Sequence, residues 1–161
     1  MPKLLFLGVL AGTVSAAVLI VNTGAVAMPA ARTSAQATAV KISTRAVPKL
    51  GVVLVNSKGR TLYMFVPDKQ TKVTCVRTCA AIWPPAKLQS GAKAVAAGQA
   101  KQSLLGSDRN PSGGRVVTYD KWPLYTYVSD SAAGQARGQA LNLNGGYWYV
   151  LAPSGKVIRT H

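Results

Sequence analysis

Acidic side chains and histidine are scarce in this chain of 161 residues. It has four aspartates, no glutamate and one histidine, His161, which is the last residue. A calcium site normally takes about six to eight oxygen ligands, and general acid–base catalysis most often uses histidine. The sequence also lacks a G-x-S-x-G elbow, an H-E-x-x-H pair and a phosphate-binding glycine-rich loop. We therefore predict a protein that is not an enzyme and that holds no cofactor or metal ion.

Basic residues dominate the charge of the chain. Nineteen lysines and arginines against four aspartates give a net charge of +15. From Leu50 onward, fourteen basic residues stand against the same four aspartates, so this part alone carries +10. A field of this size attracts polyanions of many kinds and raises their encounter rates, without selecting one of them. A dedicated polyanion site and a soluble surface with only nonspecific attraction both fit this balance.

The N-terminus has the pattern of an export signal. Lys3 precedes an uncharged, mostly apolar run from Leu4 to Val21, and Ala25-Val26-Ala27 fits the small-x-small cleavage pattern. The run of about 18 residues is also long enough to span a bilayer. We predict that residues 1–27 are a signal peptide or an uncleaved anchor. Either one places the rest of the chain outside the cytoplasm, in the periplasm, outside the cell or at its surface.

The stretch after the signal differs in composition from the rest of the chain. Residues from Pro29 to Lys49 are mostly alanine, threonine and serine with scattered basic residues, and they show no sustained periodic apolar face. Such a segment buries too little surface to offset the conformational entropy lost on ordering. We predict a flexible basic linker over residues 28–49 and one folded domain over residues 50–161.

The folded part contains an internal repeat. The stretch from Leu54 to Asp68 recurs 62 residues later from Val116 to Asp130, and each has a β-branched run, a polar turn and a second apolar run. Two such runs around a turn are the signal of a β-hairpin. We predict a mainly β domain of two repeated antiparallel hairpin units, about 50–90 and 112–155, arranged like a sandwich or barrel. A short helical turn is expected near Cys75–Trp83, and residues 95–105 could hold another.

The aromatic residues of the two copies fit a buried sheet. In a strand, Tyr63 and Phe65 point to one face, and Leu62 and Met64 point to the other. Both faces are apolar, which favours a strand buried on both sides. The alternative is a groove in which four aromatic rings stack on sugars or other flat groups. Those rings belong to Tyr63, Phe65, Tyr125 and Tyr127.

Asp68 and Asp130 follow the two aromatic segments at the same spacing. A carboxylate in this position accepts hydrogen bonds from backbone N–H groups of the next turn, which is a structural role. Alternatively, the two carboxylates meet across the repeat, where they bind a cation or act as an acid–base pair. The shortage of other carboxylates disfavours the cation site.

Cys75 and Cys79 are the only cysteines. If they lie on one helical turn, their Cα atoms are about 6 Å apart, because four residues each rise by about 1.5 Å. A disulfide tolerates that separation, and oxidation is the rule outside the cytoplasm, so we predict a structural disulfide. The alternative is a redox or copper role, since two thiolates suit a soft metal such as Cu(I).

Several spaced motifs together resemble one known family. Over about residues 50–155, the chain resembles the bacterial family of secreted repeats, often predicted lipoproteins, that carries a Y-x-(F/W/Y)-x-x-D motif. The resemblance implies an exported fold, adds Trp83 and Trp148 to the motif residues, and names no substrate, since the function of the family is unknown. The motifs are Leu62-Tyr63-x-Phe65-x-x-Asp68, Cys75-x3-Cys79-Ala80-x-x-Trp83-Pro84-Pro85, Pro123-Leu124-Tyr125-x-Tyr127-x-x-Asp130 and Gly146-x-Trp148-Tyr149-Val150.

The chain departs from the family pattern in two places. Many relatives carry a cysteine for lipid attachment after the signal, whereas this chain has no cysteine before Cys75, so we expect no lipid anchor. The turn before the second motif is Asp120-Lys121-Trp122, where such sequences often have Asn-Gly. Asn-Gly is the preferred pair of a type I′ hairpin turn, so the sequence argues against a tight turn of that type here.

These observations favour an exported envelope protein that binds through its basic surface. The expected ligands are anionic envelope polymers or lipid headgroups. Apart from such headgroups, we expect the chain to contact a membrane only through an uncleaved N-terminal segment. Export argues against nucleic acid as the physiological partner, although basic and aromatic residues alternate as in nucleic-acid binders. The alternative function is a periplasmic redox or copper-handling protein that uses Cys75 and Cys79.

Overall fold

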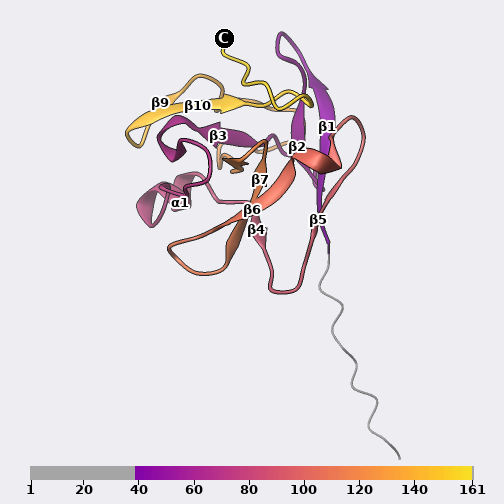
Figure 1. The fold of residues 1–161 in the computed structure, drawn as a ribbon. Helices are drawn as coiled ribbons and strands as arrows, with labels where there is room; N and C mark the ends of the chain where they lie inside the picture. The colour runs from indigo at the N-terminus through magenta and orange to yellow at the C-terminus, as the bar shows by residue number, and fades with distance from the viewer. Residues whose placement is uncertain (1–38, 161) are drawn as a thin grey trace, which may run out of the picture. The chain divides into compact units, whose positions relative to one another are not determined.

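The computed structural model describes residues 39–160 (Figure 1). The predicted signal or anchor segment, residues 1–27, and the first part of the predicted linker lie outside the described residues. Within the described range, no helix has the length and apolar character needed to cross a membrane.

The first strand corrects the predicted boundary of the domain. Strand β1, Val40–Val47, lies in the stretch predicted to be a flexible linker. It pairs antiparallel with β2, Gly51–Asn56, and parallel with β5, Ala94–Ala96. The linker prediction is therefore wrong for residues 40–49, because β1 belongs to the domain.

The sequence does not show the pattern of a strand over β1, because the two ends of β1 pack in different parts of the core. Ile42 packs in one buried cluster and Val47 in the other, five residues apart along the strand. A strand with one buried face would show apolar residues at every second position. Lysine, serine, threonine and arginine fill most of the positions between Val40 and Val47, so the stretch resembles a polar spacer.

The described strands form several small, mostly antiparallel sheets, which confirms the predicted mainly β fold. The strand orders are β2-β1-β5, β3-β10-β9 and β4-β7-β6, with β8 paired to β7, and the sheets do not close into a barrel. In Figure 1, β3 lies beside β10 and β1 lies beside β2. The remaining bounds are β3 Tyr63–Phe65, β4 Lys87–Leu88, β6 Leu105–Arg109, β7 Arg115–Tyr119, β8 Trp122–Pro123, β9 Asn142–Leu143 and β10 Gly146–Val150.

Helical structure is confined to short turns in the described residues. Helix α1, Thr78–Ile82, lies where a helical turn was predicted near the cysteines. Within residues 95–105, the expected helical turn is the single 3₁₀ turn η2, Gln102–Leu104, between strands β5 and β6. Another 3₁₀ turn, η1, covers Val66–Asp68 directly after β3.

The turn between β7 and β8 is tighter than the sequence suggested. Tyr119 pairs with Trp122, so only Asp120 and Lys121 form the loop, and both have positive φ angles, 47° and 67°. Positive φ at both central residues is the property of a type I′ turn, so the expectation against it is wrong. Aspartate tolerates the left-handed region better than most residues. A Cβ atom at Gly155 would lie 2.8 Å from the Asp120 side chain, so glycine at that position leaves room for the turn.

The core consists of two buried clusters on opposite faces of β3. Tyr63 and Phe65 belong to one, which we call the aromatic cluster, while Leu62 and Met64 belong to the other, which we call the aliphatic cluster. Burial of both faces of this strand was predicted and is confirmed. The other large members of the aromatic cluster are Trp83, Tyr125 and Trp148, and those of the aliphatic cluster are Ile42, Leu54, Leu124 and Leu151 with two tyrosines, Tyr119 and Tyr149.

Replacing Ile42 by alanine tests the position of β1. Ile42 is fully buried in the aliphatic cluster, so Ile42→Ala is expected to lower the free energy of unfolding by about 2–5 kcal/mol through lost burial and the cavity left behind. Urea denaturation followed by tryptophan fluorescence measures this. Ala46→Ser, on an exposed position of the same strand, serves as the control and should change stability by less than about 0.5 kcal/mol. Equal stability of both variants and the parent would contradict the position of β1 and favour a flexible linker over residues 40–49.

Candidate functional site

The two motif tyrosines pair with each other at the centre of the domain. The backbone N–H of Tyr63 donates to the carbonyl oxygen of Tyr125 at 2.8 Å, and the N–H of Tyr125 donates to the carbonyl oxygen of Tyr63 at 2.9 Å. The chain segments run antiparallel at this bridge. Because both residues occupy the same position in the repeat, the two copies meet here in a local twofold arrangement.

The side chains of the motif then cross from one repeat to the other. The hydroxyl group of Tyr63 donates to Asp130 Oδ2 at 2.6 Å, and the hydroxyl group of Tyr125 donates to Asp68 Oδ2 at 2.6 Å. Each repeat therefore supplies a tyrosine to the aspartate of the other repeat. Both hydrogen bonds are buried.

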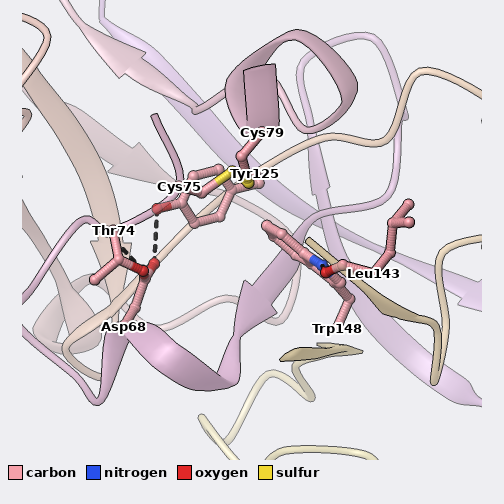
Figure 2. The surroundings of a disulfide bond; sticks show 7 residues. All are labelled: Asp68, Thr74, Cys75, Cys79, Tyr125, Leu143 and Trp148. Atoms are coloured by element: carbon pink, nitrogen blue, oxygen red, sulfur yellow. Dashed lines mark hydrogen bonds between the residues drawn. A yellow bond between two sulfur atoms is a disulfide. The ribbon is translucent and has the colours of Figure 1, made fainter. Parts of the chain in front are cut away.

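The second oxygen of each carboxylate is bonded inside its own repeat. Asp68 Oδ1 accepts from the backbone N–H of Thr74 at 2.8 Å and from the Thr74 hydroxyl at 2.6 Å, as Figure 2 shows. Asp130 Oδ1 accepts from the backbone N–H of Arg137 at 2.8 Å. The predicted acceptance of backbone N–H groups from the following turn is thus confirmed for both aspartates. The carboxylates are bonded to tyrosines of the opposite repeat and not to each other.

Burial raises the pKa of both aspartates and both tyrosines of the crosswise hydrogen bonds. Desolvation raises the pKa of Asp68, against the hydrogen bonds from Thr74 and Tyr125, and it raises the pKa of Asp130, against the hydrogen bonds from Tyr63 and Arg137. Desolvation, with the neighbouring carboxylate, also raises the pKa of the Tyr63 and Tyr125 hydroxyls. The tyrosines therefore stay protonated and keep donating across the repeats.

Four aromatic rings form a continuous stack beside these hydrogen bonds. Phe65 lies on Trp148 with ring centroids 4.1 Å apart, Trp148 lies on Trp83 at 3.9 Å with planes only 3° apart, and Trp83 lies on Tyr127 at 4.2 Å. The order is symmetric, because each outer ring comes from one repeat and stacks on the tryptophan of the other. The motif tyrosines meet the stack edge-on, Tyr63 against Trp83 and Tyr125 against Trp148.

The ring stack belongs to the core and is not an open ligand groove. Tyr63 and Tyr125 are 0% exposed and Phe65 is 3% exposed, while Tyr127 is half-buried. Trp83 and Trp148 are also fully buried. The alternative of a sugar-binding groove built from these rings is therefore wrong for the three buried ones, whose faces are covered by protein.

The two repeats differ in how they hold their tryptophans. Trp148 lies in β10, and its indole N–H donates to the Leu143 carbonyl oxygen at 2.9 Å. Trp83 follows α1, and its buried indole nitrogen has no hydrogen-bond partner among the residues that the structure describes. The aromatic rings of the two repeats are therefore arranged symmetrically, whereas the helices and strands that carry the rings differ between the repeats.

Cys75 and Cys79 form the predicted disulfide, with Cα atoms 5.2 Å apart. Cys75 directly follows Thr74, so the disulfide constrains the turn that supplies two hydrogen bonds to Asp68 (Figure 2). Closing so small a loop stabilises the fold by roughly 2 kcal/mol. Between residues 39 and 160, no three His, Cys, Asp or Glu side chains gather in a way that could hold a metal ion. The redox or copper role of this pair stays a prediction.

The crosswise pairing is the feature that the sequence interpretation missed. A local signal for it exists, because tyrosine and aspartate are five residues apart in both copies. That spacing gives both residues fixed places in each repeat, but it does not indicate which repeat completes the hydrogen bond. The arrangement joins the two halves, and all four of its side chains are buried.

Comparison with known proteins agrees with this duplicated structure. A family described as a secreted repeat of unknown function matches the chain twice, over residues 44–87 and 107–152. Together the two matches cover more than half of the chain and contain both copies of the motif. No curated protein and no solved structure matches the chain.

A double-mutant cycle tests the crosswise connection. Tyr63→Phe leaves the buried Asp130 carboxylate with one donor fewer and should lower the free energy of unfolding by about 1–3 kcal/mol. Combined with Asp130→Asn, the loss should be clearly less than additive, because both changes act on one hydrogen bond. Combined with Asp68→Asn, which lies in the same repeat as Tyr63 but bonds to Tyr125, the losses should nearly add. The cycle is measured by urea denaturation, and stronger coupling of Tyr63 to Asp68 than to Asp130 would contradict the structure.

The free energy of unfolding should rise as the pH falls, because Asp68 and Asp130 are buried. Desolvation raises the folded-state pKa of Asp68 and Asp130, whereas the unfolded chain keeps the ordinary value of about 4. Between these values the folded protein binds more protons than the unfolded chain, so its stability rises as the pH is lowered through that window and falls as the pH is raised. Urea unfolding at pH 7, 5 and 4 should show the rise in the parent protein and a smaller one in the Asp68→Asn/Asp130→Asn variant. Identical pH dependence of the two proteins would refute the raised pKa values.

Proposed function

The chain belongs to the family of secreted repeats of unknown function, and we propose that it is an exported, non-enzymatic module that binds anionic components of the cell envelope through its basic surface. The family supports export, and the closed interior supports a scaffold without chemistry of its own. The ligands are surfaces or polymers that present many phosphate or carboxylate groups.

The observation that carries the proposal is the distribution of charge between interior and surface. Residues 39–160 contain seventeen lysines and arginines and four aspartates, a net charge of +13, and sixteen of the seventeen basic residues are exposed. Two of the four acids, Asp68 and Asp130, are 0% and 2% exposed. The motif thus removes half of the negative groups from the surface, and those two carboxylates cannot meet a ligand.

A surface of this kind is suited to extended anions. Long-range attraction raises the encounter rate with a polyanion and supplies affinity through many weak contacts. Because the aromatic cluster is covered, a ligand has to be held from outside by flexible basic side chains. The proposal therefore predicts binding that depends on ionic strength and on the number of charges in the ligand.

Salt dependence is the test of this function. Binding of the exported protein to purified anionic wall polymer, and separately to vesicles containing phosphatidylglycerol, is measured by co-sedimentation at about 50 and 200 mM salt. Release of counterions on binding should weaken the affinity by about tenfold or more between these conditions. Uncharged glucan and phosphatidylcholine vesicles are the controls. No binding at low salt, or binding that salt leaves unchanged, would overturn the proposal.

A further inference from the structure

We infer that a linear anionic polymer binds along two adjoining hollows beside strand β1, held by Lys87, Lys41 and Arg45. This inference rests on the proposed function and names the site within the basic surface. The two hollows are next to each other because the same three residues, Lys41, Asn56 and Ser57, line both of them.

The first hollow combines an apolar floor with a cationic rim. Its volume is about 370 Å³, within the range of small-molecule sites. Half-buried Val40, Pro85 and Ala86 supply its apolar lining, and exposed Lys41 and Lys87 line it as well. An anionic group can pair with the ammonium groups while the carbon skeleton of the ligand lies on the apolar floor.

The second hollow continues the site along the exposed side of β1 and is polar. Its volume is about 220 Å³, and Lys41, Ser43 and Arg45 line it together with Ser57. Alternate residues of a strand point to the same face, so Lys41, Ser43 and Arg45 form a row. Four residues of strand separate the two cations by about 13 Å along the chain. That distance exceeds the size of one phosphate, so a polymer can contact the two cations with separate charged groups along its length.

The backbone around the second hollow favours this position of Arg45. A Cβ atom at Gly59 would lie 3.2 Å from the Arg45 guanidinium group, so the guanidinium rests against the turn because residue 59 is glycine. Asn56 Oδ1 already accepts from the backbone N–H groups of Lys58 and Arg60, each at 3.0 Å. Its amide N–H groups therefore remain as donors beside the hollow.

Charge distinguishes these hollows from a larger one elsewhere on the domain. No carboxylate lines either hollow beside β1. The hollow of about 470 Å³ near β6 and the β7–β8 turn includes Asp108 and Asp120 among its lining residues. Those carboxylates repel an anion, so volume alone does not select the site. Two other hollows also lack a carboxylate, but each has a single basic residue, Lys93 or Lys49, whereas three basic residues line the pair beside β1.

The test replaces cations in the hollows and compares them with cations outside. Lys41→Gln/Arg45→Gln/Lys87→Gln removes three positive charges from the hollows. The control, Lys69→Gln/Lys72→Gln/Arg109→Gln, removes two lysines and one arginine from exposed positions that line neither hollow. Titration calorimetry at about 100 mM salt measures binding of long-chain polyphosphate and of poly-γ-glutamate. Circular dichroism first checks that both variants keep the thermal midpoint of the parent.

The expected result is a loss of affinity of about tenfold or more in the hollow variant and of less than about threefold in the control. Equal losses would overturn the site and leave the proposed function standing, because they would show that only total charge matters. No binding of either polymer by the parent protein would overturn the proposed function itself. Orthophosphate that binds the parent as tightly as polyphosphate, with the same loss in the hollow variant, would overturn the assignment of a linear polymer.

Discussion

The exchange of tyrosine–aspartate hydrogen bonds between the repeats is the constraint on which the rest of the structure depends. A buried carboxylate without donors costs several kcal/mol, and it is tolerated only when hydrogen bonds replace its lost hydration. Asp68 needs the hydroxyl of Tyr125, and Asp130 needs the hydroxyl of Tyr63. A single repeat satisfies one oxygen of its aspartate and leaves the other to the second repeat. The two copies are therefore parts of one domain and not two independent units.

The spacing of the motif follows from this exchange. The tyrosine lies at the backbone bridge between the copies, and the aspartate lies five residues on, at the end of a 3₁₀ turn in the first copy. The aromatic residue two positions after the tyrosine stacks on the tryptophan of the opposite copy, as Phe65 does on Trp148 and Tyr127 on Trp83. The tyrosine, the second aromatic residue and the aspartate of each motif thus all make a contact with the other copy.

Local patterns in the sequence predicted local structure well. The repeat, the β-rich fold, the helical turn near the cysteines and the disulfide between residues four apart all depend on short stretches of chain. One local expectation failed, the one against a type I′ turn at Asp120 and Lys121. The other failures concern relations between distant residues. Strand β1 divides its two buried residues, Ile42 and Val47, between separate clusters, so no periodic pattern reveals it. The partner of each aspartate is 57 or 67 residues away, and equal spacing within the copies cannot indicate the exchange between them.

The same constraint explains why the motif identifies a fold and leaves the ligand open. The motif tyrosines Tyr63 and Tyr125, the two aspartates and the two tryptophans are buried, so their contacts maintain the interior and present nothing to a partner. Outside that interior the copies diverge: the first has α1 and the disulfide before its tryptophan, and the second has the β9–β10 pair. The three basic residues of the hollows beside β1, Lys41, Arg45 and Lys87, also lie outside the motifs. In the proposed site, the basic residues that contact the polymer can therefore change while the crosswise hydrogen bonds stay the same.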